Sequence, residues 1–189
     1  MNKLIEKQII TIEGDNFSGR TELLESLVAD INNLSEKNCR LDSYYLPSDT
    51  NTSISGLMPT VKSELSLQSE NWEKNKLIST LIKTFDFSNL LDRNPFTLSG
   101  GEQVILGLIC GLSNHPKLLA IDCTLEQLSA NRRNIFFDCG LNGGFSPSAI
   151  AIADNRLFEY NKYSKIEKLK INVKRDENYI IGNIDPSVD

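Results

Sequence analysis

A run of β-branched residues that leads directly into a glycine-framed loop constrains the fold of this chain more than any other feature. Residues 8–13 (QIITIE) have the composition of a buried strand, and the run ends at Gly14. From Thr21 to Leu34 the apolar residues recur at helical spacing. A strand, a glycine loop and a helix therefore follow one another without a gap.

The rest of the chain repeats these two patterns. We predict further strands at 40–46, 118–121, 148–153 and 166–173, and helices at 102–112 and 128–137. Residues 61–91 predict two or three short helices, with breaks near 68–71 and around Asp86. Strands that alternate with helices are typical of an α/β fold built around a parallel sheet.

The glycine loop fits the pattern G-x-x-x-x-G-[K/R]-[ST]. Its residues, called the phosphate loop below, are Gly14, Asp15, Asn16, Phe17, Ser18, Gly19, Arg20 and Thr21. Glycines let such a backbone wrap a phosphate, and the N–H groups of the loop and of the following helix supply positive potential. We expect the Thr21 hydroxyl to bind Mg²⁺. Arg20 replaces the usual lysine and keeps its charge, but its planar fork is bulkier and prefers bidentate contacts.

The alternative for this loop is a glycine turn that starts a helix without binding phosphate. The length and composition of the chain are compatible with either interpretation of this loop.

The 189 residues fit one domain over 1–189, with a small α-helical subdomain at about 55–98 and a polar tail at about 183–189. The formal net charge of −5 argues against nucleic-acid binding, which needs a basic surface.

The sequence also lacks the marks of secretion or of a metal-cysteine site. Its four cysteines form no C-x-x-C pair, and the N-terminus has no signal-peptide pattern. No apolar run approaches the roughly 20 residues of a membrane span. We therefore expect a cytoplasmic protein.

A second motif stands near the middle of the chain: Leu98, Ser99, Gly100, Gly101 and Glu102. An apolar helix follows it, and then a short apolar strand that ends at Asp122. With the phosphate loop upstream, this order and spacing resemble the ATP-binding-cassette (ABC) family of ATPases over about residues 9–154. A helix-capping loop alone would explain the serine and one glycine of the motif, but not the rest of the block.

The resemblance implies a P-loop NTPase fold of the ABC type, with ATP and Mg²⁺ as ligands. Asp122 would hold Mg²⁺ together with Thr21. In this family the LSGGE loop contacts the nucleotide of the opposite subunit, so the working unit is a head-to-tail dimer. Thirteen residues precede Gly14 and none is aromatic, so we expect reduced N-terminal antiparallel strands and no aromatic platform for adenine.

Positions that support hydrolysis in the family hold other residues here. The glutamate expected after Asp122 is Cys123, and the switch histidine falls at Asp154, an anion in place of a donor. By alignment, the Q-loop glutamine falls at Ser48 and the D-loop aspartate at Ser129. Because phosphoryl transfer depends on positioning and electrostatics, we expect little or no ATP hydrolysis by the chain alone.

The sequence therefore predicts a degenerate ABC-type ATP-binding subunit of a transporter, which supplies its LSGGE loop to a partner's ATP site. Its partners would be a second ABC-type subunit, as a homo- or heterodimer, and a transmembrane subunit at the inner face of a membrane. One alternative is a non-enzymatic ABC-like interaction or regulatory protein, in which nucleotide is at most a dimerisation ligand. Another is a slow ATPase that uses Glu126 or Asp154 as the missing carboxylate.

Overall fold

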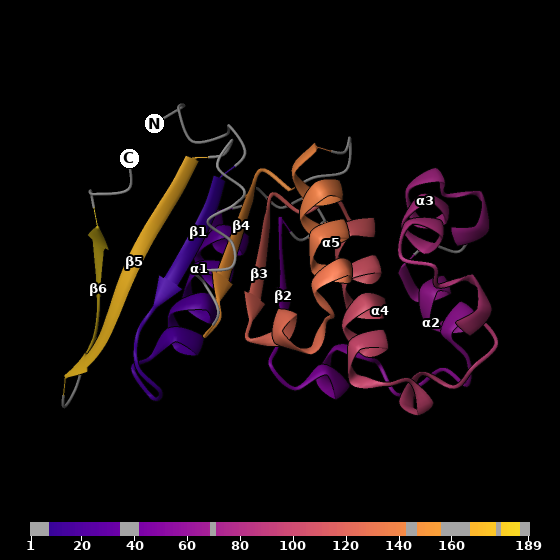
Figure 1. Cartoon of the computed structure of the whole chain (residues 1–189), viewed down its shortest axis with the longest axis horizontal. Helices are drawn as coiled ribbons and strands as arrows, with labels where there is room; N and C mark the ends of the chain where they lie inside the picture. The colour runs from indigo at the N-terminus through magenta and orange to yellow at the C-terminus, as the bar shows by residue number, and fades with distance from the viewer. Residues whose placement is uncertain are drawn as a thin grey trace.

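The sheet of this protein has six strands in the order β2-β3-β4-β1-β5-β6 (Figure 1). The computed structural model describes residues 8–34, 42–68, 71–142, 147–155, 167–176 and 179–185. The strands are β1 (Gln8–Glu13), β2 (Ser43–Leu46), β3 (Leu118–Asp122), β4 (Ala149–Ala153), β5 (Glu167–Asp176) and β6 (Tyr179–Asp185). The first five strands run parallel, and β6 pairs antiparallel with β5 at the sheet edge. The predicted α/β fold with a parallel sheet core is confirmed.

Helices cover both faces of the sheet (Figure 1). The α-helices are α1 (Arg20–Leu34), α2 (Val61–Gln68), α3 (Lys76–Thr84), α4 (Gly100–Ser113) and α5 (Ala130–Asn142). The 3₁₀ helices are η1 (Thr50–Ser53), η2 (Trp72–Lys74), η3 (Ser88–Leu90), η4 (Pro95–Thr97) and η5 (Thr124–Gln127). On β3, Leu118 and Ala120 pack with α1, whereas Leu119 and Ile121 pack with α4 and α5. Successive strand residues point to opposite faces of the sheet. Helices therefore have to cover both faces of a strand with an apolar run such as LLAI.

The carboxyl ends of β1, β3 and β4 lie side by side. In the parallel pairing, Ile12 lies opposite Ala153, and Asp122 also lies opposite Ala153. Because parallel strands end at one edge of the sheet, the segments that follow these three strands meet there. The phosphate loop, Cys123 and the residues after Ala153 are therefore neighbours, although long stretches of chain separate them.

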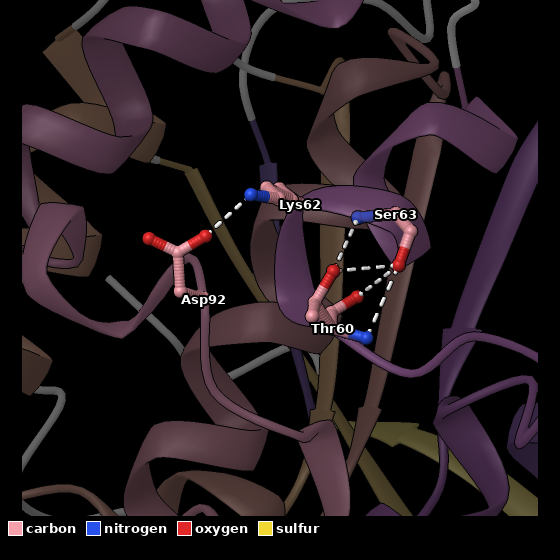
Figure 2. Close-up of polar contacts among 4 residues, drawn as sticks. All are labelled: Thr60, Lys62, Ser63 and Asp92. Atoms are coloured by element: carbon pink, nitrogen blue, oxygen red, sulfur yellow. Dashed lines mark hydrogen bonds and ion pairs between the residues drawn. The ribbon is translucent and has the colours of Figure 1, made fainter.

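The helical segment between β2 and α4 lies at the far end of the molecule from β6, with α2 and α3 against α4 (Figure 1). Thr60 caps α2, because its Oγ1 accepts from the Ser63 N–H at 3.3 Å while Ser63 Oγ accepts from the Thr60 N–H at 3.1 Å (Figure 2). Lys62 pairs with Asp92 (Figure 2), and the Lys62 N–H donates to the Leu91 carbonyl at 2.9 Å. The start of α2 is thereby fixed to the segment that leads into η4.

Two boundaries differ from the prediction. The helix predicted at 128–137 begins at Ala130, because residues 124–127 first form η5. The first three residues of the polar tail predicted at about 183–189 are the end of β6, where the backbone pairs with β5. Residues 1–7, 40–41 and 186–189 lie outside the described ones, so the reduction of the N-terminal strands stays a prediction.

Candidate functional site

The phosphate loop connects β1 to α1 through a tight turn. The Ser18 N–H donates to the Asp15 carbonyl at 3.1 Å, and Gly19 has a φ of 101°, which L side chains rarely adopt. A Cβ added at Gly14 would lie 2.7 Å from the Val173 carbonyl oxygen of β5. Glycine at both ends therefore lets the backbone close the turn and approach the neighbouring strand.

Three observations fit this loop to an anionic ligand. Ser18 Oγ is buried and has no hydrogen-bond partner within the described part of the chain. Such a group costs about 1–3 kcal/mol, which a bond to a ligand oxygen would offset. The loop also precedes the N-terminus of α1, a 15-residue helix whose first N–H groups attract phosphate. Phe17, at the loop tip, is 92% exposed with a φ of 65°, and strain of this kind clusters at ligand sites.

Thr21 and Asp122, which the sequence predicts as magnesium ligands, are in direct contact. Thr21 Oγ1 donates to Asp122 Oδ2 at 2.8 Å, and Asp122 is 2% exposed at the end of β3. The Tyr45 hydroxyl of β2 donates to the same oxygen at 3.1 Å. Burial, and then the charge of Asp122, raise the pKa of Tyr45 well above its usual value, so this hydroxyl stays a donor. A hydroxyl beside a carboxylate is a pair of oxygen ligands that suits Mg²⁺.

Cys123 follows directly, in left-handed backbone with a φ of 53°. Its N–H donates to the Ala153 carbonyl at 2.7 Å, which joins the ends of β3 and β4. Burial, and then the charge of Asp122, raise the pKa of the Cys123 thiol to about 11, against the opposing effect of Arg20. The thiol is therefore protonated near neutral pH and cannot act as a general base there.

The two polar residues after β4 take different positions. Asp154, where the sequence places the switch residue, is 2% exposed. Asn155 is exposed, and its Oδ1 accepts from both Nη atoms of Arg20 at 3.1 Å. The Asn155 N–H donates to Glu126 Oε1 at 3.1 Å. Asn155 thus contacts the phosphate loop through Arg20.

The second predicted loop, Leu98–Glu102, forms the start of α4. The Ser99 N–H and Oγ donate to Glu102 Oε2 at 2.7 and 2.8 Å, as part of a capping box. The hydrogen bond from the Ser99 N–H is the largest of the causes that lower the pKa of Glu102. Leu98 is buried, whereas Ser99 and Gly100 are exposed. The loop is therefore held by its own residues and presents a helix N-terminus to solvent.

Gln127 of η5 packs against this loop. A Cβ at Gly101 would lie 2.9 Å from the Gln127 carbonyl oxygen, and one at Gly100 would lie 2.6 Å from Gln127 Oε1. Gln127 Nε2 also donates to the Ser48 carbonyl at 3.4 Å. Ser129 Oγ accepts from a backbone N–H of α5 at 3.4 Å. The segments that the sequence predicts as Q-loop and D-loop, which hold Ser48 and Ser129, therefore lie beside Leu98–Glu102.

A family model described as "ABC transporter" matches residues 2–125, which is more than half of the chain. The chain belongs to the ABC transporter family. HrtA of Staphylococcus saprophyticus subsp. saprophyticus, whose name gives it as an ATP-binding protein for hemin import, is 34% identical over 91 residues, covering 47% of this chain and 41% of HrtA. The zinc import ATP-binding protein ZnuC of Ehrlichia canis is 29% identical over 134 residues, covering 69% of this chain and 54% of ZnuC. The chain thus spans about half the length of the curated relatives it matches.

Solved ABC structures share the fold. MJ0796, described as a bacterial ABC transporter cassette, superposes with a TM-score of 0.65 at 15% identity, over 89% of this chain and 82% of that chain. The cbiO1 protein of Clostridium perfringens superposes with a TM-score of 0.65 at 16% identity, over 92% of this chain and 75% of that chain. The ABC-type P-loop fold is therefore shown, and Leu98–Glu102 is called the signature loop below. Among the described residues of this ABC chain, no helix combines the length and the apolar character needed to cross a membrane.

Sequence reasoning missed two residues that surround this ABC site. The sequence did signal Tyr45, a polar side chain near the carboxyl end of a predicted strand, and the register places it opposite Ala120, two residues before Asp122. Asn155 carries no such signal. Which of two successive polar residues turns outward after a strand depends on the local backbone, which only the structure supplies.

Proposed function

We propose that this chain is an ABC-type ATP-binding subunit that completes a partner's ATP site with its signature loop and hydrolyses ATP weakly or not at all at its own. The contrast between Ser99 and Cys123 carries the proposal. Ser99 lies exposed at a capped helix N-terminus, an arrangement that favours a bound anion. Cys123 offers a protonated thiol where the family resemblance places a carboxylate.

The chain's own site would bind ATP with Mg²⁺. The phosphate-loop backbone and Ser18 Oγ would bind the phosphates, and Thr21 with Asp122 would hold the metal. When bound, the metal neutralises phosphate charge. The carboxylate of Glu126, which could replace the missing base, accepts from the Asn155 N–H instead, and this favours a structural role over a slow ATPase.

The second candidate is a non-enzymatic interaction or regulatory protein. The contact between Arg20 and Asn155 favours it, because the guanidinium that a phosphate would need is already bonded within the chain. In that case the protein would bind nucleotide as a dimerisation ligand at most. Equilibrium binding and sedimentation are measured with ATP and Mg²⁺, and the absence of both ATP binding and an ATP-dependent dimer would favour this second candidate.

The import names of HrtA and ZnuC support a transporter as the assembly. We propose a head-to-tail pair of cassettes, homo- or heterodimeric, bound to a transmembrane subunit at the cytoplasmic face of a membrane. The negative net charge of −5 supports this over a nucleic-acid partner.

The test mixes the purified chain with an ABC cassette from the same cell that has both the phosphate-loop lysine and the carboxylate after its metal-binding aspartate. We expect Mg²⁺-dependent ATP turnover by the mixture above the sum of the two proteins alone. Ser99→Ala should remove most of that gain, by about tenfold or more, because the signature contact acts on the transferring phosphate.

Ser26→Ala is the matched control, since Ser26 is an exposed serine in the middle of α1. It should leave the gain unchanged. A gain that survives Ser99→Ala as fully as Ser26→Ala would contradict the proposed role of the signature loop.

A further inference from the structure

Two tyrosines stand next to each other in β2 and face opposite sides of the sheet. Tyr44 packs on the side of α4, where its ring covers Gly111. Tyr45 packs on the side of α1, and its hydroxyl donates to Asp122 Oδ2 at 3.1 Å. One of the two phenol groups is thereby placed against the carboxylate that the sequence predicts as a magnesium ligand.

The backbone holds Tyr45 in a fixed position relative to Asp122. Strand β2 pairs in parallel with β3, and Tyr45 lies opposite Ala120. Beyond the two strands, the buried Thr124 hydroxyl lies within hydrogen-bond distance of the Asp122 carbonyl, at 2.8 Å, and of the Pro47 carbonyl, at 3.1 Å. The segments that carry Tyr45 and Asp122 are therefore tied together both before and after Asp122.

The orientation of the Asp122 carboxylate depends on its hydrogen bonds. The last torsion of an aspartate side chain is broad and roughly two-fold, so bonds have to select one orientation. Thr21 Oγ1 and the Tyr45 hydroxyl both donate to Oδ2, at 2.8 and 3.1 Å. Since Asp122 is 2% exposed, bulk water has little access to replace either donor. These two donors therefore set how the carboxylate presents its oxygens to the site.

The two donors differ in their relation to the metal. Thr21 is itself an expected ligand of Mg²⁺, whereas Tyr45 contacts the ligand Asp122 from the neighbouring strand. Hydrogen bonds of this kind orient a ligating carboxylate, and their loss commonly lowers metal affinity by about 10–100-fold. Because a neutral hydroxyl leaves the charge of the carboxylate in place, we expect its orienting effect to outweigh the partial sharing of Oδ2.

We propose that Tyr45 is a positioning residue of the magnesium site, whose hydroxyl holds the Asp122 carboxylate in the orientation that binds the metal and so strengthens Mg²⁺-dependent binding of ATP. This inference rests on the proposed function, because it requires ATP and Mg²⁺ at the chain's own site. It assigns to β2 a part in metal binding beside those of the phosphate loop and β3.

The test measures equilibrium binding of AMP-PNP to the full chain, once with Mg²⁺ and once with EDTA. Tyr45→Phe removes the hydroxyl and keeps the ring that packs against α1. It should weaken AMP-PNP binding about tenfold with Mg²⁺ and by less than about twofold with EDTA. A role in packing alone would move both affinities together, so the ratio of the two separates a positioning role from a structural one.

Tyr44→Phe is the matched control, because it removes a phenol hydroxyl from the adjacent residue on the other face of the same strand. It should leave both affinities unchanged. Equal weakening with Mg²⁺ and with EDTA by Tyr45→Phe, or an unchanged or larger gain from Mg²⁺, would overturn the inference while leaving nucleotide binding intact. If the unmodified chain fails to bind AMP-PNP, or gains no affinity from Mg²⁺, the proposed nucleotide or metal binding is itself wrong, and this inference falls with it.

The route through Asp122 is tested with Asp122→Asn, which keeps an acceptor for the Tyr45 hydroxyl but removes the charge. In this background, Tyr45→Phe should change the gain in AMP-PNP affinity from Mg²⁺ by less than about twofold, because the carboxylate that it positions is gone. A tenfold effect that persists in the Asp122→Asn background would contradict a role of Tyr45 that acts through Asp122.

Discussion

The signature loop and the phosphate loop differ in what holds them. Ser99 and Glu102 of the signature loop bond to each other, three residues apart, and the helix they cap is buried along most of its length. The phosphate loop and the start of α1 are held instead by contacts with distant segments of the chain. Thr21 contacts Asp122, and Arg20 contacts Asn155. A locally held loop retains its form when its surroundings change, whereas a site assembled from distant segments loses function when one of them is replaced.

Two of the positions at which the sequence predicts a lost hydrolytic residue, Cys123 and Asp154, lie near the phosphate loop, whereas Ser48 and Ser129 lie in segments beside the signature loop. Cys123 and Asp154 both belong to the segments that follow β3 and β4, at the carboxyl edge of the sheet. None of the signature-loop residues departs from the family motif. The comparison therefore predicts that changes at Cys123 affect only the chain's own site, whereas changes at the signature loop affect a partner's site.

The largest expected effect comes from restoring the carboxylate. Cys123→Glu places an acid next to Asp122, and we expect ATP turnover at the chain's own site to rise by up to about 10², the usual contribution of one positioned group. Turnover is measured with ATP and Mg²⁺ on the purified variant. Cys123→Gln is the control, because it has the same size and backbone strain but no charge; an equal rise in both variants would show that the thiol, and not the missing carboxylate, limits hydrolysis.

A pair of glycine variants tests how tightly the signature loop is held. A Cβ at Gly101 meets the Gln127 backbone oxygen at 2.9 Å, whereas one at Gly100 meets the movable Gln127 side chain at 2.6 Å. Gly101→Ala should therefore lower the free energy of unfolding by about 1–3 kcal/mol, and Gly100→Ala by less. Urea denaturation measures both. The opposite order would mean that Gln127 does not support the loop through its backbone.

The proposed magnesium ligands, Thr21 and Asp122, are tested by the Mg²⁺ dependence of ATP binding. Thr21→Ala removes the hydroxyl that contacts Asp122, so the gain in ATP affinity from Mg²⁺ should shrink about tenfold, while Thr21→Ser keeps it. Binding is measured with Mg²⁺ and with EDTA for each variant. If alanine and serine behave alike, the Thr21 hydroxyl is no part of the metal site.

The fold and the two loops were predictable because their signals are local. The run QIITIE, the glycines of the phosphate loop and the Ser99–Glu102 capping box each lie within a few residues of one another. The contact between Arg20 and Asn155 spans 135 residues and depends on the order β3-β4-β1, which no local pattern encodes. Strand β6 was missed for the same reason, because its stability comes from pairing with β5 and not from a strong pattern of its own.

The smallest expected effect is a pH dependence at the signature loop. The Ser99 N–H lowers the pKa of Glu102 below its usual value of 4.5, so the contribution of this carboxylate to stability is complete above that value and is lost as pH falls through the folded pKa. At pH 7, Glu102→Gln should be less stable than the unmodified chain by about 0.5–1 kcal/mol, and the difference should vanish in acid. Thermal unfolding of both proteins across this range measures it. A difference that does not depend on pH would show that the charge of Glu102 is not involved.

ATP turnover by the purified chain alone tests the central claim most directly, with Thr21→Ala measured beside it. The account predicts that Mg²⁺-dependent turnover is no higher in the unmodified chain than in Thr21→Ala, although the unmodified chain binds ATP. A clear Mg²⁺-dependent turnover that Thr21→Ala abolishes would contradict it, and would make this chain an active ATPase in its own right.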